Sequence, residues 1–370
     1  MNVPDLDIFL AAAPGLEPAL AEEARALGFA RPQPVPGGVT TAGPWAEVWR
    51  ANLSLRGAAR VLVRLGSFRA LHLAQLDRRA RKFPWAETFR PGTPVKVEAS
   101  CRGSKIYHAG AAAERVETAL RAALGPASDE EPLRLLARIE DDLVTLSLDT
   151  SGAPLHQRGF KQEVGKAPLR ETLAAAFLRQ CGYCGDEPVI DPMCGSGTFV
   201  LEAAEIALGL LPGRGRSFAF ERLASFDQAA WDGLRDRPPP GPAPAPALLF
   251  RGYDRDQGAV RMATANAARA GLSAVTRFAC QPISELARPE GPPGLVMVNP
   301  PYGARIGEKK PLFALYATLG KVLAERFQGW RLGLVTSEPQ LARATGLALQ
   351  AGPPIPHGGL KVQLWRGGPF

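Results

Sequence analysis

Cysteine is scarce in this sequence of 370 residues, and long apolar runs are missing from it. Its five cysteines are an odd number without the spacing of a disulfide framework. The single Cys-x-x-Cys pair, Cys181 and Cys184, has no second ligand pair that would complete a zinc site. No apolar stretch reaches the roughly 18–20 residues that a membrane span needs. The sequence therefore predicts neither a metal centre nor a membrane anchor.

The amino terminus also lacks the marks of a signal peptide. Asp5, Asp7 and Glu17 stand where a signal peptide carries Lys or Arg, and the apolar stretch 8–13 is shorter than an h-region. The hydrophobic and charged fractions, 46% and 22%, are ordinary for a folded chain. We expect a cytoplasmic protein that acts as a monomer.

Positive charge is concentrated in one stretch of the chain. The net charge is +8, and between Arg50 and Arg121 fifteen Lys and Arg face five acidic residues. Such a block favours a polyanionic partner through phosphate neutralisation, although a solvated basic face without a partner has the same composition. The densest part of the block consists of Arg78, Arg79, Arg81 and Lys82.

Strand and helix patterns divide the chain into two parts. Up to about residue 157 strands and helices are interspersed with short turns, which is typical of an α+β layer. After a polar connector, residues 158–170, strands and helices alternate, which predicts a Rossmann-like doubly wound α/β fold. The proline-rich stretch Pro238–Pro246 is expected to be a surface connection within this second part.

Hydrophobic periodicity predicts the individual strands and helices. The expected strands are 7–12, 61–65, 94–99, 143–148, 189–190, 247–253, 295–298, 331–336 and 361–365. The expected helices are 15–27, 111–124, 171–180, 199–208, 257–270 and 311–327.

A glycine-rich loop follows the expected strand 189–190 and opens a helix. Gly195 and Gly197 lack the third glycine of a dinucleotide fingerprint and the lysine of a P-loop. What remains is a site for a ligand with a small anionic end, such as the carboxylate of methionine, or a purely structural turn. Asp254 ends the next strand, where a carboxylate binds ribose hydroxyls in doubly wound folds or caps the following helix.

The strongest signal is Asn299-Pro300-Pro301-Tyr302, directly after an apolar strand. The two prolines fix the backbone at the carboxyl end of that strand, where open α/β sheets bind ligands. The side-chain carbonyl of Asn299 and the backbone carbonyl of Pro300 could accept both protons of a base amine and direct its lone pair. We expect Tyr302 to be exposed and to stack on the base. The alternative is a rigid turn.

With these motifs in place, the chain resembles the THUMP-domain RNA methyltransferases, and most closely the bacterial enzymes that methylate the 2-amino group of guanine in large-subunit ribosomal RNA. The segments that carry the resemblance are DPMCGSGTFVLEAAEIA from Asp191, GYDRD from Gly252, NPPYGARIG from Asn299, HQRGF from His156, APLRETLAAA from Ala167 and LSLRGAARVLVR from Leu53. Together they cover nearly the whole chain.

The resemblance implies a ferredoxin-like segment at residues 1–45, a THUMP RNA-binding domain at 46–157 and a Rossmann-like methyltransferase domain at 158–370. It also implies S-adenosylmethionine as the cofactor and RNA as the partner. The residues implied to surround the methionine end of the cofactor are Asp191, Pro192, Gly195, Gly197, Thr198 and Thr172. Asp254 is implied to bind the ribose, and Asn299, Pro300 and Tyr302 are implied to bind the target base.

One position departs from the family pattern. Relatives carry an Asp that binds the cofactor adenine where this chain has Pro282, so Gln281 or a backbone carbonyl would have to supply that contact. Arg305, after the tyrosine, is a candidate phosphate contact or an ordinary surface residue. Covalent catalysis by Cys194 is disfavoured because it lies in the cofactor loop.

Alternative functions remain open at this point. The same reaction on transfer RNA and methylation of an adenine 6-amino group in nucleic acid use the same type of loop. A non-catalytic RNA-binding assembly factor would keep the fold without the reaction.

Overall fold

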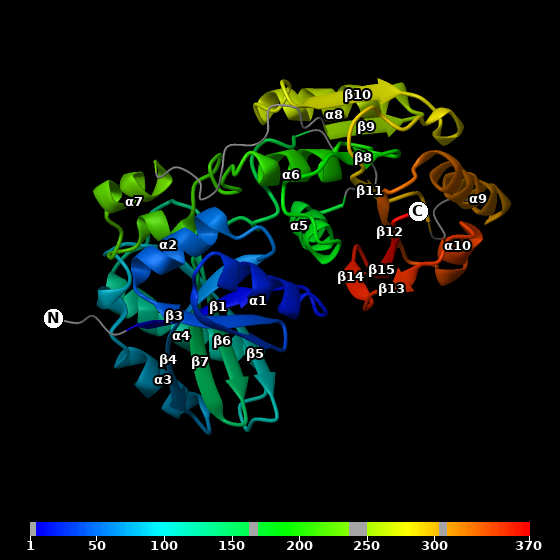
Figure 1. Cartoon of the computed structure of the whole chain (residues 1–370). Helices are drawn as coiled ribbons and strands as arrows, with labels where there is room; N and C mark the ends of the chain where they lie inside the picture. Colours follow the sequence, from blue (N-terminus) through cyan, green and yellow to red (C-terminus); the bar gives the residue numbers. More distant parts are fainter. Residues whose placement is uncertain (1–4, 163–168, 237–249, 303–308) are drawn as a thin grey trace. The chain divides into compact units, whose positions relative to one another are not determined.

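The computed structural model of the chain describes residues 5–162, 169–236, 250–302 and 309–370 (Figure 1). Its contacts divide the chain into two compact units. The first unit comprises residues 1–12, 20–155 and 216–237, and the second comprises residues 13–19, 156–215 and 238–370. Each unit contains one large β-sheet.

The first unit contains a sheet of seven strands in the order β2-β3-β1-β4-β7-β6-β5. Neighbouring strands are antiparallel except β5 and β6, which are parallel. The strands are β1 (Leu6–Ala11), β2 (Ala30–Val35), β3 (Gly38–Gly43), β4 (Arg60–Arg69), β5 (Val95–Arg102), β6 (Leu133–Glu140) and β7 (Leu143–Asp149).

Alternating side chains build the core of this unit. In β6 every second residue is buried, from Leu133 through Leu135 and Ala137 to Ile139, as expected for a sheet with one face covered. The helices and 3₁₀ turns assigned to this part of the sequence are α1 (Glu17–Ala26), α2 (Trp45–Ser54), α3 (Leu73–Arg81), η1 (Trp85–Glu87) and α4 (Ala109–Leu124).

A late segment of the chain also belongs to the first unit. Residues 216–237, which include η2 (Ala219–Arg222) and α7 (Gln228–Arg235), cluster with it although the flanking residues belong to the second unit. Aromatic packing explains the attachment, because the Phe220 ring stacks on Trp49 and meets Trp231 edge-on.

The second unit contains the alternating strands and helices. Its sheet has the order β10-β9-β8-β11-β12-β15-β13, with β14 paired to β15. The pairs from β10 through β9, β8 and β11 to β12 are parallel, and β15 is antiparallel to β12. The strands are β8 (Val189–Asp191), β9 (Phe250–Asp254), β10 (Thr276–Cys280), β11 (Leu295–Val298), β12 (Arg331–Thr336), β13 (Gln350–Ala351), β14 (Ile355–His357) and β15 (Leu360–Gly367).

Two hydrophobic clusters lie on opposite faces of this sheet. Leu295 and Met297 of β11 belong to one cluster and Val296 and Val298 to the other, because successive side chains of a strand point to opposite faces. Helices α5 and α6 contribute to the first cluster and α9 to the second. The helices are α5 (Glu171–Gln180), α6 (Thr198–Ala207), α8 (Gln257–Arg269), α9 (Lys309–Arg326), α10 (Pro339–Ala344) and the short η3 (Ile283–Glu285).

The strands and helices expected from periodicity are present, with ends that shift by a few residues. The expectations did not include β2, β3, β6, β10, α2, α3, α7 or α10. The sequence of β2, ARPQPV, contains two prolines, and the strand lies at the edge of its sheet, where a missing amide costs no ladder bond. Within the described residues, the helices include none long and apolar enough to cross a membrane. The same residues hold no cluster of His, Cys, Asp and Glu that could bind a metal ion.

Candidate active site

The glycine loop, residues 191–198, joins β8 to α6 and is closed by its own hydrogen bonds. The Met193 amide donates to Oδ1 of Asp191 at 3.0 Å, and the Gly197 amide donates to the carbonyl of Cys194 at 2.8 Å. Gly195 and Gly197 adopt φ values of +51° and +86°, which favour glycine. A Cβ on Gly195 would meet nothing within 4 Å, so the loop leaves open space beside it.

The Asp191 carboxyl is buried beneath this loop. Burial raises its pKa well above the usual range, the hydrogen bond from Met193 lowers it, and the nearby Asp254 carboxylate raises it further. Its donor partner is part of the loop itself, so the immediate effect of Asp191 is to shape the turn. Its contact with a cofactor, like that of Pro192, stays a prediction.

Asp254, at the end of β9, is tied to the same loop. Its Oδ2 accepts the Gly195 amide at 3.0 Å, and its Oδ1 accepts the Asp256 amide at 3.0 Å. The cap of the following helix α8 is Asp256, whose Oδ1 accepts the Gly258 amide at 2.8 Å. Asp254 is therefore not the cap of α8, and its carboxylate lies beside the glycine loop; its contact with a ribose stays a prediction.

The cysteine of the loop is a poor nucleophile. Cys194 is buried, and this burial raises the pKa of its thiol well above the usual value, with the Asp191 and Asp254 carboxylates acting in the same direction. A thiolate, not a thiol, attacks in covalent catalysis. The environment therefore agrees with the expectation that Cys194 is structural.

The asparagine corner, residues 299–302, follows β11 at the same edge of the sheet. Strands β8 and β11 are adjacent and parallel, with Val189 opposite Leu295, so their carboxyl ends lie next to each other. Oδ1 of Asn299 is buried and has no hydrogen-bond partner among the residues that the structure describes. Buried acceptors are normally satisfied, and the contact of this oxygen with a base amine stays a prediction.

Tyr302 differs from the expectation of an exposed aromatic. Its side chain is half-buried and packs against both hydrophobic clusters of the second unit, and burial raises the pKa of its hydroxyl. A large apolar ring gains free energy by covering part of the core. The stacking of a base on this ring stays a prediction.

The two threonines assigned to the methionine end of the cofactor are both buried. The Thr198 hydroxyl accepts a hydrogen bond from Nζ of Lys161 at 2.8 Å, and the same Nζ lies 3.1 Å from the Glu171 carboxylate and 3.1 Å from the carbonyl of Leu169. Burial raises the pKa of Glu171, against the opposite effect of Lys161. Sequence reasoning assigned no role to Lys161, because its partner Thr198 lies 37 positions away.

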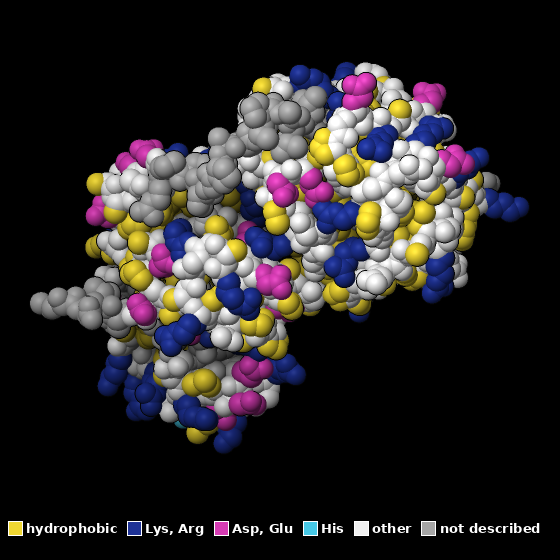
Figure 2. Space-filling model, viewed as in Figure 1, with side chains coloured by type: hydrophobic (Ala, Val, Ile, Leu, Met, Phe, Trp, Pro, Cys, Tyr) yellow, Lys and Arg dark blue, Asp and Glu magenta, His cyan; other side chains and the backbone are white. Residues whose placement is uncertain are grey.

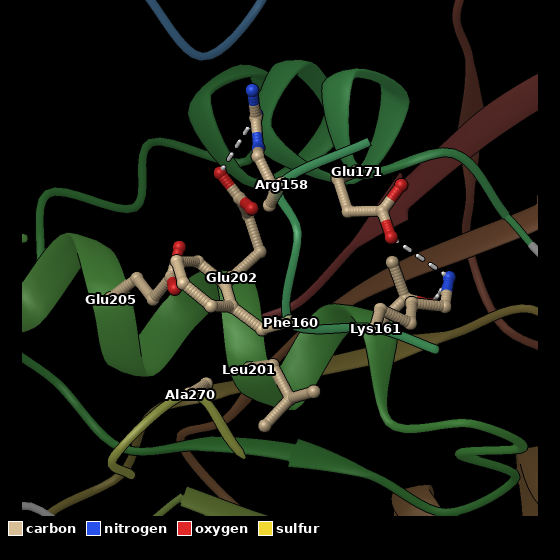
Figure 3. Close-up of a pocket in the computed structure, with 9 residues that line it drawn as sticks. Arg158, Phe160, Lys161, Glu171, Leu201, Glu202, Glu205 and Ala270 are labelled. Atoms are coloured by element: carbon tan, nitrogen blue, oxygen red, sulfur yellow. Dashed lines mark hydrogen bonds and ion pairs between the residues drawn. The ribbon is translucent and has the colours of Figure 1, made fainter. Parts of the chain in front are cut away.

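Figure 3 shows these groups in a small pocket beside α6. A second buried ion pair, Arg158 with Glu202 at 3.5 Å, lines the same pocket. The lining shares only Thr198 with the residues assigned to the cofactor. The hydrogen bond from Lys161 to Thr198 therefore supports the first turn of α6, and the other residues assigned to the cofactor are not part of this pocket's lining.

The remaining predicted residues lie elsewhere. Arg78, Arg79, Arg81 and Lys82 are exposed at the end of α3, and Arg81 pairs with Asp77 at 3.0 Å. Pro282 caps η3, and the Gln281 amide donates to the carbonyl of Asp254 at 3.0 Å. Arg305 lies outside the described residues.

A parallel sheet with helices on both faces, an antiparallel β15 and a glycine loop at the end of β8 define a Rossmann-like methyltransferase class of fold. The family model described as RMKL-like, methyltransferase domain, matches residues 158–351, and that of the RlmL ferredoxin-like domain matches residues 7–62. The chain belongs to the RMKL-like methyltransferase family. The predicted family and the α/β fold class with an N-terminal ferredoxin-like part are thus confirmed.

Individual relatives agree with this assignment. Ribosomal RNA large subunit methyltransferase K/L of Syntrophotalea carbinolica is 37% identical over 96% of this chain and 53% of its own length. The protein named "Putative RNA methyltransferase slr0064" of Synechocystis is 32% identical over 97% of this chain and 95% of its own. The solved structure of SMU.472, "a putative methyltransferase complexed with SAH", is 26% identical with a TM-score of 0.87, covering 99% of this chain and 98% of that one. The chain spans about half the length of the K/L relatives it matches.

Proposed function

We propose that the chain transfers a methyl group from S-adenosylmethionine to the exocyclic 2-amino group of a guanine in large-subunit ribosomal RNA. The observation that carries the proposal is Oδ1 of Asn299, which is buried and has no partner among the described residues, at the end of the strand adjacent to the one that leads into the glycine loop. The names of the K/L relatives and the SAH-bound neighbour support the substrate and the cofactor.

The residues at the sheet edge fit the proposed cofactor. The open space beside Gly195 and the Asp254 carboxylate offer room and an acceptor for a ribose, and the first turn of α6 offers free amides to a carboxylate. In this proposal Asp254 binds the ribose, while Gly195, Gly197 and Thr198 surround the methionine end. When bound, the cofactor supplies a methyl group that is already activated on sulfur.

The asparagine corner would supply the rest of the chemistry. An exocyclic amine is a weak nucleophile because its lone pair is delocalised into the ring. Two acceptors, Oδ1 of Asn299 and the carbonyl of Pro300, would bind its two protons, localise the lone pair and stabilise the positive charge that develops on nitrogen. The exposed part of the Tyr302 ring would stack on the base, and alignment of amine and methyl group would lower the remaining barrier.

The test is methyl transfer from labelled S-adenosylmethionine to transcripts of large-subunit ribosomal RNA and of transfer RNA, followed by nucleoside analysis. The proposal expects 2-methylguanine in the ribosomal transcript. If only the transfer RNA becomes labelled, or if the product is 6-methyladenine, the proposed substrate is wrong but the protein is still an RNA methyltransferase. Failure to methylate any RNA, together with no binding of S-adenosylmethionine by calorimetry, would favour the RNA-binding assembly factor.

RNA binding is proposed for the basic end of α3. Figure 2 shows Lys and Arg side chains gathered around the position of this helix at the lower left of the view. Replacing Arg78, Arg79, Arg81 and Lys82 by Glu should weaken RNA binding and flatten its salt dependence, because phosphate contacts release counterions. Binding of S-adenosylmethionine should not change. Action on ribosomal RNA would place the protein in the cytoplasm, where we expect it to act as a monomer.

A further inference from the structure

A buried lysine connects the starts of helices α5 and α6. The side chain of Lys161 is 8% exposed, and its Nζ lies 2.8 Å from Oγ1 of Thr198, the first residue of α6. The same Nζ lies 3.1 Å from the carbonyl oxygen of Leu169 and 3.1 Å from the carboxylate of Glu171, the first residue of α5 (Figure 3). Because an ammonium group has three donors and no acceptor, these three contacts satisfy it completely. The lysine bridge is the group formed by Lys161, Leu169, Glu171 and Thr198.

The chemistry of lysine fixes the direction of the bond to Thr198. The ammonium group can only donate, so Oγ1 of Thr198 accepts, and the hydroxyl keeps its own proton for an acceptor other than Lys161. The residue before α6 is Gly197, which has no side chain that could cap the free amides of the helix. The first turn of α6 therefore offers an anion its backbone amides together with one hydroxyl proton whose direction Lys161 restricts.

The carboxylate of Glu171 balances the charge of the lysine bridge. Burial raises the pKa of this carboxyl and Lys161 lowers it, as expected for an ion pair removed from solvent. With the ammonium group balanced in this way, its effect on a ligand comes through the orientation of Thr198 and not through an uncompensated charge. The next residue, Thr172, is also buried and is the second threonine assigned to the methionine end of the cofactor. The lysine bridge thus joins the two chain segments that carry these threonines.

We propose that Lys161 is a positioning residue that directs the Thr198 hydroxyl toward the carboxylate of S-adenosylmethionine and thereby makes the site prefer a cofactor that carries this carboxylate. A hydrogen bond to a charged acceptor is about twice as strong as one between neutral groups, but only when its donor is well aligned. Losing the alignment should therefore weaken the binding of a ligand with the carboxylate and not of one without it. This inference rests on the cofactor of the proposed function, but it does not depend on the RNA substrate.

A purely structural role is the competing explanation, and the same unit offers a matched control. Arg331, the first residue of β12, donates to the carbonyl of Cys181 and to the carboxylate of Glu187, just as Lys161 bonds to one carbonyl and one glutamate. Burial also raises the pKa of Glu187, against the effect of Arg331. Since β8, β11 and β12 are parallel, Arg331 lies at their amino ends, at the edge of the sheet opposite to the glycine loop. Its loss should lower stability without changing the cofactor site.

The experiment uses the full chain and two ligands that differ only in the carboxylate, S-adenosylmethionine and decarboxylated S-adenosylmethionine. Calorimetry gives both dissociation constants for the wild type, Lys161→Met and Arg331→Met, and thermal unfolding gives their melting temperatures. In Lys161→Met we expect the dissociation constant of S-adenosylmethionine to rise about tenfold or more, and that of the decarboxylated ligand to stay within about threefold. Arg331→Met should melt earlier than the wild type, with both constants within about threefold.

Two double variants separate alignment from loss of fold. Lys161→Met/Glu171→Gln removes the carboxylate that Lys161→Met leaves buried without its partner, so it should regain melting temperature but not affinity for S-adenosylmethionine. Lys161→Met/Thr198→Val tests whether the lysine acts through the threonine. Its affinity for S-adenosylmethionine should equal that of Thr198→Val alone, because the hydroxyl that Lys161 orients is already absent.

Three results would overturn the proposal: equal losses of affinity for both ligands in Lys161→Met, an affinity for S-adenosylmethionine within threefold of the wild type in that variant, or additive losses in Lys161→Met/Thr198→Val. A wild-type protein that binds neither ligand would overturn the proposal together with the cofactor of the proposed function. A wild-type protein that binds S-adenosylmethionine more tightly than the decarboxylated ligand but methylates no RNA would refute the proposed function alone, and the variants would still decide the role of Lys161.

Discussion

The glycine loop and the asparagine corner lie at the ends of adjacent strands of one sheet, yet their polar groups are satisfied in different ways. The glycine loop closes on itself: Asp191 accepts from Met193, and Asp254 accepts from Gly195. The asparagine corner leaves Oδ1 of Asn299 without a partner among the described residues, and its Pro301 carbonyl accepts from the Tyr316 hydroxyl. A loop that closes on itself can present a surface to a ligand, whereas a buried acceptor that lacks a partner among the described residues costs stability that a donor group of a ligand would restore.

Asn299→Ala should produce the largest effect. Removing one of two preorganised acceptors should lower kcat by about 10²–10³-fold, as for the loss of one group of an oxyanion hole. The dissociation constant of S-adenosylmethionine should stay within about threefold, since the substitution leaves the glycine loop intact. Single-turnover methyl transfer and calorimetry measure the two quantities. A rate within tenfold of the wild type would remove Asn299 from the reaction.

Asp254→Ala should give the opposite pattern. Losing hydrogen bonds to a charged acceptor costs about 1.5–3 kcal/mol, so the dissociation constant of S-adenosylmethionine should rise at least tenfold, while kcat at saturating cofactor changes less. Asp256→Ala is the matched control, because it removes the cap of α8 at a cost of about 1 kcal/mol without touching the glycine loop. Equal affinity losses in both variants would show that the loss comes from α8 and not from a ribose contact.

Substitutions of the two glycines in the glycine loop should lower the melting temperature by different amounts. Gly197→Ala would place a Cβ at 3.2 Å from Ala263 in a left-handed conformation, whereas a Cβ on Gly195 would meet nothing within 4 Å. A left-handed non-glycine residue costs roughly 1–2 kcal/mol, so both variants should melt earlier, and Gly197→Ala should melt earliest. Thermal unfolding with and without S-adenosylmethionine checks this order. In Gly195→Ala the methyl group enters the proposed cofactor space, and stabilisation by the cofactor should therefore be weaker.

Asp191→Asn should have the smallest effect, on stability and its pH dependence. Burial raises the pKa of the Asp191 carboxyl well above 3.8, so keeping it ionised at neutral pH destabilises the folded state. The group's favourable contribution is complete below its unfolded pKa and disappears as the pH rises through the folded pKa. Asn keeps an acceptor for Met193, so the variant should melt later than the wild type at pH 8, with a smaller difference at pH 5. A difference in melting temperature that is the same at pH 5 and pH 8 would show that burial of the ionised Asp191 carboxylate is not the cause.

Local patterns were sufficient to predict much of the fold. Alternation and helical periodicity predicted β8, β9, β11, β12 and β15 of the second sheet and the helices α5, α6, α8 and α9, because each of these signals lies within one element, but they did not predict β6 or β10. Asp254 shows where this reasoning stops. From the sequence, an acidic residue before a helix is equally consistent with a helix cap and with a residue that binds a ligand. The structure shows that Asp256, not Asp254, caps α8.

By itself the sequence determined the α/β class, the glycine loop and the asparagine corner, since prolines, glycines and apolar periods act on the backbone within a few residues. The tertiary structure decided which unit residues 216–237 join and how far Tyr302 is buried. It also decided that Lys161 donates to the Thr198 hydroxyl and that the Tyr316 hydroxyl donates to the Pro301 carbonyl. These features depend on side chains brought together from separate elements. In these two hydrogen bonds the donor and the acceptor are 37 and 15 positions apart in the sequence. The free energy of packing, not local conformational preference, therefore selects the partners.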